Sequence, residues 1–105
     1  MTIRRTNRLN QKKWLKENNH LKILDLGCSN VNFWPEANNF ADIVDYTDHF
    51  KKLNFPYTQI FPNKKLPFKD KEFDYVILSH VMEHVPNLID FKEELVRIAK
   101  AGYIE

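Results

Sequence analysis

The first residues that could bind a ligand or take part in a reaction form a short motif in the N-terminal third of the chain. Residues 23–28 run Ile-Leu-Asp-Leu-Gly-Cys, so that Asp25 and Gly27 stand where an apolar run ends. An apolar run that stops at a glycine is typical of a buried parallel strand followed by a turn. Because glycine has no β-carbon, a ligand can approach its backbone closely. The motif predicts a ligand-binding turn at Gly27, although Asp25 could also serve only to cap the amides of that turn.

A second group of chemically capable residues lies in the C-terminal third. Residues 80–84 read His-Val-Met-Glu-His and match a zinc-protease motif, in which two histidines bind zinc and the glutamate polarises water. A third ligand would have to come from Glu93 or Glu94, close by on the next predicted helix. We therefore interpret the match as accidental and predict no metal, with Glu83 and His84 forming the start of a helix.

The single cysteine, Cys28, follows the glycine turn directly. It could act as a nucleophile with His80 or His84, but a free cysteine is more often a small buried packing residue. One cysteine cannot form an internal disulfide. We expect Cys28 to pack rather than to react.

Strand-like and helix-like patterns alternate along the chain. Helical patterns cover residues 7–18 and 87–100, a further turn or two fits within 46–56, and Gly102 is placed to end the second long helix. Strand patterns cover residues 22–26, 40–45, 57–61 and 73–78, and another begins at 103. The alternation predicts an α/β fold with a mostly parallel sheet. In such sheets ligands bind beyond the carboxyl ends of the strands, here after Leu26, Asp45 and Leu78.

The order of these motifs resembles the class I S-adenosylmethionine-dependent methyltransferases, and the type 11-like members among them. Beside residues 23–28, the resemblance rests on Leu-Pro-Phe at 66–68 and on residues 73–85, which open Phe-Asp and end Glu-His-Val. Residues 94–98 and 102–104 suit the following helix and fifth strand, so the resemblance covers about residues 20–105. It implies a Rossmann-like sheet, S-adenosylmethionine as cofactor, and methyl transfer to an acceptor that the sequence does not identify.

The resemblance also implies a set of cofactor contacts in the first turn. Asp25 and Gly27 would lie near the methionine part of the cofactor, and Cys28 and Ser29 would follow along it. The family usually has further glycines where this chain has Ser29 and Val31. The short connection to the next strand leaves little room for the usual first helix.

The remaining implied site residues follow the second and fourth strands of the family fold. An acid after the second would hold the ribose hydroxyls, because a carboxylate can accept from both. Asp42 and Asp45 both qualify, and register favours Asp42. Ser79 and His80 would line the pocket near the transferable methyl, with His80 as the candidate general base. The acid expected beside the adenine is replaced by Pro62 or Asn63, at positions 62–63.

The charge of the chain is concentrated near its start. Net charge is only +2, yet residues 1–18 carry one acid against six bases: Arg4, Arg5, Arg8, Lys12, Lys13 and Lys16. We interpret this run as the solvated face of a helix rather than a nucleic-acid site. It divides the chain into a basic N-terminal helix or extension, 1–20, and a methyltransferase-like domain, 21–105. The sequence shows no membrane span and no secretory signal, which makes the cytoplasm the default location.

The family sheet has seven strands, whereas the patterns found here reach the fifth. An uncovered edge on that strand predicts pairing, either with further polypeptide or with a second copy in a homodimer. Two functions follow as expectations. One is a methyltransferase for a small-molecule or unknown acceptor, which need not be active alone. The other is a non-catalytic binding or assembly module of the same fold.

Overall fold

The computed structural model describes residues 1–61 and 64–105. Along these residues the chain forms β1 (Thr2–Ile3), α1 (Arg8–Glu17), β2 (Ile23–Leu26), β3 (Asn39–Asp42), α2 (Thr47–Lys52), β4 (Tyr57–Gln59), β5 (Phe73–Leu78), the short 3-10 helix η1 (Met82–His84), α3 (Leu88–Ile98) and β6 (Ala99–Ile104). None of the helices within the described ranges is long and apolar enough to cross a membrane.

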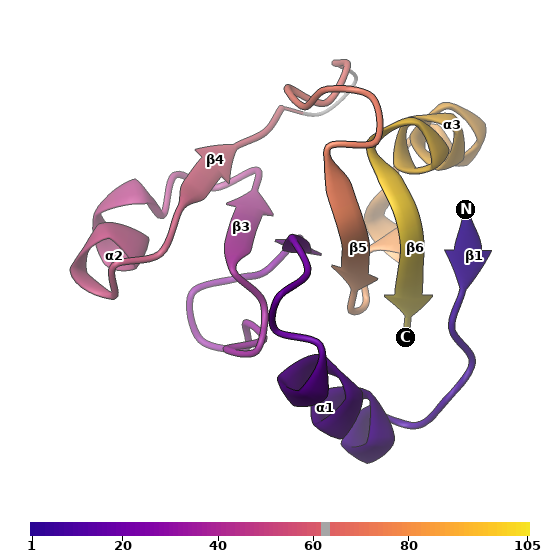
Figure 1. The fold of residues 1–105 in the computed structure, drawn as a ribbon. Coiled ribbons are helices and arrows are strands. Elements are labelled where there is room, and N and C mark those ends of the chain that lie inside the picture. The colour runs from indigo at the N-terminus through magenta and orange to yellow at the C-terminus, as the bar shows by residue number, and fades with distance from the viewer. Residues whose placement is uncertain (62–63) are drawn as a thin grey trace.

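The strands form one parallel sheet in the order β1-β6-β5-β2-β3-β4 (Figure 1). From β2 the chain first builds outward through β3 and β4, then crosses back to add β5 and β6 on the other side of β2. The α/β, mostly parallel, Rossmann-like architecture predicted from the sequence is thus confirmed. The strand order reverses between β2 and β5, which is where open parallel sheets bind ligands.

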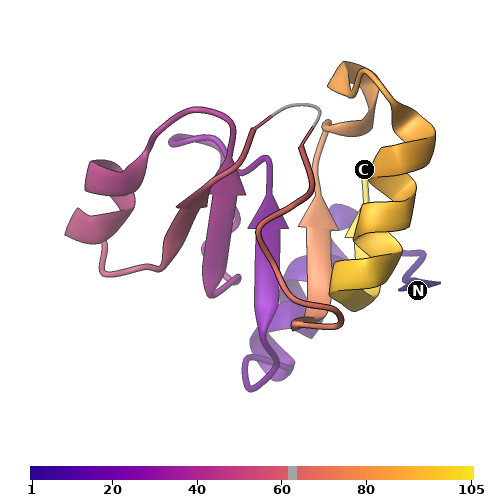
Figure 2. The same cartoon turned by 90° about the horizontal axis from the view of Figure 1, so that it is seen from above.

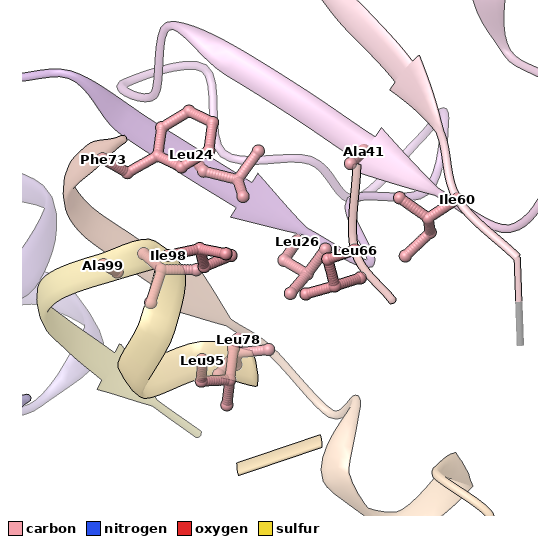
Figure 3. Close-up of a cluster of buried hydrophobic side chains, with 11 residues drawn as sticks. Leu24, Leu26, Ala41, Ile60, Leu66, Phe73, Leu78, Leu95, Ile98 and Ala99 are labelled. Carbon is pink, nitrogen blue, oxygen red and sulfur yellow. The ribbon is translucent and has the colours of Figure 1, made fainter. Parts of the chain in front are cut away.

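One face of the sheet is covered by α3 and by the connection that leads into β5 (Figure 2). Leu95 and Ile98 of α3 pack with Leu26 and Leu78 of the central strands, and Leu66 closes the cluster from the connection (Figure 3). The four residues of β2 are all buried, as expected for a strand with both faces covered. This packing fixes the ends of β2 and β5 relative to each other.

The opposite face of the sheet is covered by α1, by α2 and by the connection between β2 and β3. Its buried cluster includes Leu15 from α1, Phe50 from α2, Trp34 from the connection and Phe40 from β3. Phe40 and Phe50 stack with ring centroids 4.8 Å apart. The cluster is largely aromatic, which lets the short α2 bury enough surface to hold its place.

Both longer helices begin at an asparagine cap. The side chain of Asn7 accepts the Asn10 amide at 2.8 Å, and that of Asn87 accepts the Asp90 amide at 3.1 Å. Such caps satisfy amides that the first turn leaves free, and fix where the helix starts. They account for the agreement between the predicted helices and α1 and α3 at their first residues.

The C-terminal part of the prediction needs correction. Residues 99 and 100 belong to β6 rather than to the preceding helix, and Gly102 lies inside this strand instead of ending the helix. A β-carbon on Gly102 would lie 2.8 Å from the Val76 carbonyl oxygen, so β6 approaches β5 too closely for a side chain at that point. The glycine serves strand packing and not helix termination.

The N-terminal strand was not predicted. Thr2 pairs with Ala101 and Ile3 with Gly102, which places β1 along the outer side of β6. The amide of Arg4 continues the ladder by donating to the Gly102 carbonyl at 2.8 Å. The first residues of the chain therefore cover part of the strand edge.

Candidate functional site

A cavity of about 690 Å³ opens at the carboxyl ends of the central strands. Its size falls within the range of roughly 300–1,000 Å³ that is usual for small-molecule sites. The sheet side is formed by Leu26, Gly27 and Asp42, and the facing side by residues of the segment 80–87 and of α3, among them His80 and Phe91. The location agrees with the reversal of strand order between β2 and β5.

Gly27 forms the floor of this cavity. Its φ of +77° lies in the left-handed region that favours glycine, and a β-carbon added to it would lie 2.4 Å from Cγ2 of Val81. The amides of Gly27 and Cys28 both donate to the Ala41 carbonyl, at 2.8 and 3.2 Å, and so hold the turn against β3. The turn predicted at Gly27 exists, and its bare backbone faces the cavity.

Asp25 lies beneath the turn, almost completely buried at 1% exposure. Its carboxylate accepts the Trp34 amide at 2.7 Å. Burial raises the pKa of Asp25 to about 7, against the lowering effect of that hydrogen bond, and the charge of Asp42 adds to the rise. Asp25 is not among the residues that line the cavity, and its visible contact anchors the connection that carries Trp34.

The structure separates the two acids that competed for the ribose. Asp42 lines the cavity and accepts the Ser29 and Ile43 amides at 2.8 and 2.7 Å. Asp45 lies outside the cavity lining and accepts the amide of Thr47, at 3.1 Å, and its hydroxyl, which lowers the pKa of Asp45. Of the two, Asp42 is in a position to meet a ligand, and Asp45 shapes the start of α2.

Cys28 and Ser29 lie behind the turn rather than in the cavity lining. Cys28 is 2% exposed, and burial together with the charge of Asp25 raises the pKa of its thiol well above the usual range. Ser29 adopts φ +62°, a left-handed conformation that glycine takes more readily than serine. Val31 is exposed and does not line the cavity, so it does not obstruct the Gly27 floor.

Ser79 and His80, which follow β5, point to different places. Ser79 donates its hydroxyl to Oε1 of Glu105 at 2.8 Å and is absent from the cavity lining. His80 lines the cavity, and its backbone takes φ +56°, an uncommon conformation for a residue with a side chain. Strained backbone of this kind persists where its surroundings hold it, often at functional sites.

The zinc-like motif does not assemble a metal site. Oε1 of Glu83 lies 3.7 Å from Nδ1 of His80 and 4.0 Å from Nε2 of His84, with all three side chains largely exposed. The segment forms only the short helix η1, which begins at Met82, after His80. Within residues 1–61 and 64–105, no group of three or more His, Cys, Asp or Glu side chains is arranged to hold a metal ion.

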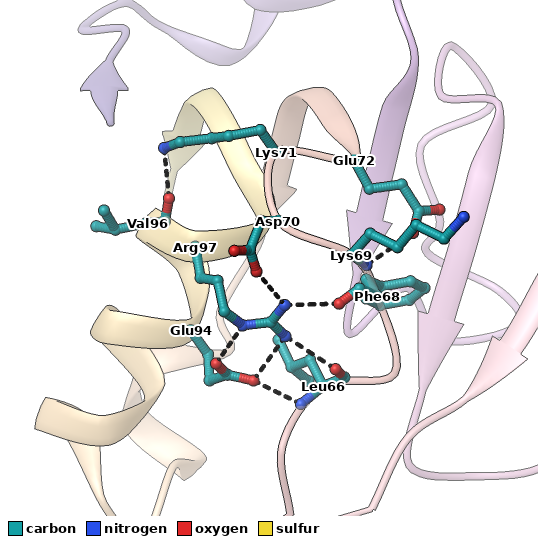
Figure 4. A network of polar contacts seen from close by, with 9 residues as sticks. All are labelled: Leu66, Phe68, Lys69, Asp70, Lys71, Glu72, Glu94, Val96 and Arg97. Carbon is teal, nitrogen blue, oxygen red and sulfur yellow. Dashed lines mark hydrogen bonds and ion pairs between the residues drawn. The ribbon is translucent and has the colours of Figure 1, made fainter.

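One polar network beside the cavity was missed by the sequence analysis. Arg97 of α3 donates to the carbonyls of Leu66 and Phe68 at 3.0 and 2.7 Å, and its Nε lies 2.6 Å from Glu94 Oε2 (Figure 4). Glu94 in turn accepts the Leu66 amide at 2.7 Å, and the hydrogen bond from Arg97 lowers the pKa of Glu94. The pair holds Leu66, a residue of the cavity wall, against α3. The sequence contained a signal for this pair, because Glu94 and Arg97 are three positions apart and so lie on one face of the helix.

The position expected to face the adenine, 62–63, lies outside the described residues. Of the eight candidate site residues, the cavity brings together three: Gly27, Asp42 and His80. The other five support the turn, the adjoining loops or α2.

Comparison with known proteins agrees with this geometry. Residues 24–104 match a family model described as "Methyltransferase domain", which covers most of the chain. The chain belongs to this methyltransferase family, and the class I assignment made from its motifs is confirmed. No curated protein matches the sequence.

Solved structures share the fold at low sequence identity. An S-adenosylmethionine-dependent methyltransferase from Aquifex aeolicus is similar with a TM-score of 0.61 and 16% identity, over 85% of this chain and 58% of its own. A Thermotoga maritima protein, described as an S-adenosylmethionine-dependent methyltransferase and possible histamine N-methyltransferase, gives 0.65 and 14%, over 88% and 53%. The trans-methyltransferase CalH, in complex with S-adenosylhomocysteine, gives 0.65 and 17%, over 84% and 32%. The chain thus spans between about one third and three fifths of these proteins' lengths.

Proposed function

We propose that the cavity above Gly27 binds S-adenosylmethionine and that the chain contributes this site to methyl transfer onto an as yet unidentified acceptor. One observation carries the proposal. A bare glycine turn and a carboxylate, Asp42, share the cavity at the reversal of strand order, in a chain of the methyltransferase family. Methyl transfer by the whole protein to which this site belongs is part of the proposal, and so is the existence of an acceptor.

The residues present fit such a cofactor. Asp42 keeps acceptor capacity beyond its two short backbone contacts, because a carboxylate offers about four lone-pair sites. It would accept the ribose hydroxyls. Ile43 and Phe61 are exposed apolar side chains in the same wall and would flank the adenine. Gly27 would admit the methionine part close to the backbone.

The cofactor would supply an electrophilic methyl group bonded to sulfur. The chain's own residues would bind and orient the two reactants, since alignment is the main contribution a protein makes to such a transfer. Phe91 and Val85 offer apolar surface on the facing wall. His80, at the cavity mouth, would accept a proton from an acceptor that must lose one.

A second candidate, a non-catalytic binding or assembly module, is favoured by the hydrogen bonds that Asp42 accepts. The Asp42 carboxylate accepts the Ser29 and Ile43 amides and so fixes the turn after β2 and the loop after β3, which gives its position a structural purpose of its own. Under this candidate the sheet edge beyond β6, of which β1 covers Ala101 and Gly102, would pair with a second copy of the chain. A cytoplasmic location and the division into residues 1–20 and 21–105 belong to both candidates.

Calorimetric titration with S-adenosylhomocysteine tests the first candidate. We expect the folded chain to bind it, and Asp42→Asn to weaken binding about tenfold or more, because a hydrogen bond to a charged group is lost. Asp45→Asn is the matched control, since it changes a neighbouring carboxylate that does not line the cavity. Circular dichroism and urea unfolding would establish that each variant is folded.

Two outcomes of this titration would contradict the first candidate. If the folded chain does not bind at millimolar ligand, or if both aspartate variants bind as the wild type does, the cavity is not the cofactor site. Sedimentation of the chain would then test the assembly module, which requires a concentration-dependent dimer.

A further inference from the structure

Arg8 of α1 contacts two segments that lie far apart in the sequence. Its guanidinium carbon is 4.4 Å from the centroid of the Trp34 ring. The same guanidinium pairs with the side chain of Glu105, 97 positions away. One side chain therefore joins the connection after β2 to the segment that follows β6.

At the first of these contacts, Trp34 holds the connection that begins at Gly27. Its side chain is completely buried, and its amide donates to Asp25 at 2.7 Å. Its ring meets that of Tyr103 edge-on, with centroids 5.7 Å apart. A displacement of Trp34 would be transmitted along this connection to the floor of the cavity.

At the second contact, Glu105 holds the turn that carries Ser79 and His80. Its side chain accepts the Ser79 hydroxyl at 2.8 Å and the Tyr103 hydroxyl at 2.7 Å. Its backbone donates to the Leu78 carbonyl at 2.9 Å and accepts the His80 amide at 2.8 Å. These bonds secure the left-handed backbone of His80.

The charge on Glu105 agrees with this arrangement. Burial opposes ionisation of its side chain, yet the hydrogen bonds from Tyr103 and Ser79 and the charge of Arg8 hold the pKa of Glu105 below its usual value. Glu105 is thus an anion that gathers donors from β6, from the turn after β5 and from α1.

We propose that Arg8 is a positioning residue, which fixes the Trp34 connection and the Ser79–His80 turn relative to each other, and with them Gly27 and His80 of the cavity lining. Its effect on ligand binding rests on the proposed function, whereas the coupling of the two segments does not. Lys12 also lies over the Trp34 ring, at 4.8 Å, but it pairs with Glu36 rather than with Glu105. Tyr103 contacts both Trp34 and Glu105 as well, but from β6, next to Glu105 in the sequence, whereas Arg8 joins them from α1.

The contact is suited to positioning more than to stability. The Arg8 side chain is 47% exposed and that of Glu105 19%, and ion pairs with an exposed partner contribute little to folding. If Arg8 contributed only to the stability of the fold, its replacement would leave both segments in place, provided that the chain stays folded.

Nuclear magnetic resonance of the ligand-free, full chain tests the coupling. Arg8→Ala should shift the Trp34 indole signal and also the amide signals of Ser79 and His80, and Glu105→Gln should do the same. Lys12→Ala is the matched control, because it removes a cation from the Trp34 ring without touching Glu105. It should shift the Trp34 signal alone. If Arg8→Ala leaves the Ser79 and His80 signals at their wild-type positions, the proposal is wrong.

A binding measurement completes the test. Arg8→Ala should weaken S-adenosylhomocysteine binding about threefold to thirtyfold, the usual range for a residue that couples sites without touching the ligand. Arg8→Lys keeps the charge but lacks the planar fork, so it should fall between wild type and Arg8→Ala. Equal affinity of all three folded chains would overturn the link to the cavity. Absence of binding by the wild type would instead remove the proposed function, while the resonance experiment would still decide the coupling.

Discussion

The side chain of Val81 occupies the space beside Gly27, at the floor of the cavity, that a β-carbon on this glycine would need. A β-carbon at Gly27 would lie 2.4 Å from Cγ2 of Val81, far inside contact distance, and Gly27 also has φ +77°. The glycine of the first turn is therefore required by a side chain of this chain itself. The two loops that bound the cavity are fitted to each other at this point.

Gly27→Ala should destabilise the chain by about 2–4 kcal/mol, from steric overlap together with left-handed strain. Val81→Ala should relieve the overlap but not the strain, so the double variant should be more stable than Gly27→Ala. Urea unfolding of the four proteins forms a double-mutant cycle. Strictly additive effects would show that Val81 is not what excludes a side chain at position 27.

Asp25 gives the stability of the chain a distinctive dependence on pH. Its pKa is raised from 3.8 to about 7 by burial, so between these values the folded chain retains a proton that the unfolded chain releases. Stability contributed by this group is complete below 3.8 and is lost as the pH rises through 7. The total change is about 4 kcal/mol.

Asp25→Asn should remove this dependence, because the amide is neutral at every pH and its oxygen can still accept the Trp34 amide. The variant should match the wild type near pH 4 and should be several kcal/mol more stable at pH 8, about 4 at most. Urea unfolding at a series of pH values measures the difference between the two chains. A constant difference across the series would contradict a raised pKa for Asp25.

Arg97 connects α3 to the cavity wall through two backbone carbonyls. Arg97→Ala leaves the carbonyls of Leu66 and Phe68 without their donor and the Glu94 carboxylate without its partner. We expect a loss of about 2–3 kcal/mol in the free energy of unfolding. Lys92→Ala, an exposed change on the same helix, should stay within about 0.5 kcal/mol of wild type. Similar losses in both variants would mean that the network contributes nothing specific.

Cys28 should be unreactive in the folded chain. Its thiol is buried and its pKa is raised, so both access and the thiolate fraction are low. Labelling by a thiol reagent at pH 8 should be about a hundredfold slower in buffer than in denaturing urea, because reaction must wait for opening of the structure. Rapid, complete labelling of the native chain would disprove the packing role.

The sequence predicted the elements whose pattern is local. Residues 73–78 form β5 with the predicted bounds, because a strand with an apolar core, here residues 76–78, needs no distant information to be recognised. The strand β1 has only two residues, and its partners, at 101 and 102, lie at the other end of the sequence. Nothing in two residues signals such a pairing. The start of β6 was missed because its alanines suit a helix as well as a strand.

The site could be predicted in part for the same reason. The glycine turn and the position of His80 follow from the ends of β2 and β5, which the sequence marks. The predicted strand at 40–45 ran too far, because β3 ends at Asp42. Register favoured Asp42 over Asp45 but did not decide between them, since the distinction depends on the contact of Asp45 with Thr47 at the start of α2. The contacts of Arg8 and Arg97 join segments that only the folded chain brings together.

The pairing of β1 with β6 also bears on the order in which the chain can fold. Residues 2 and 3 are synthesised almost a hundred positions before their partners at 101 and 102. They cannot be fixed on the ribosome until β6 has emerged, whereas β2, β3 and β4 can pair early. Contacts of such wide sequence separation form slowly, because a long loop must close before they stabilise anything. Residues 2 and 3 thus find their place later than the strands β2, β3 and β4 that follow them in the sequence.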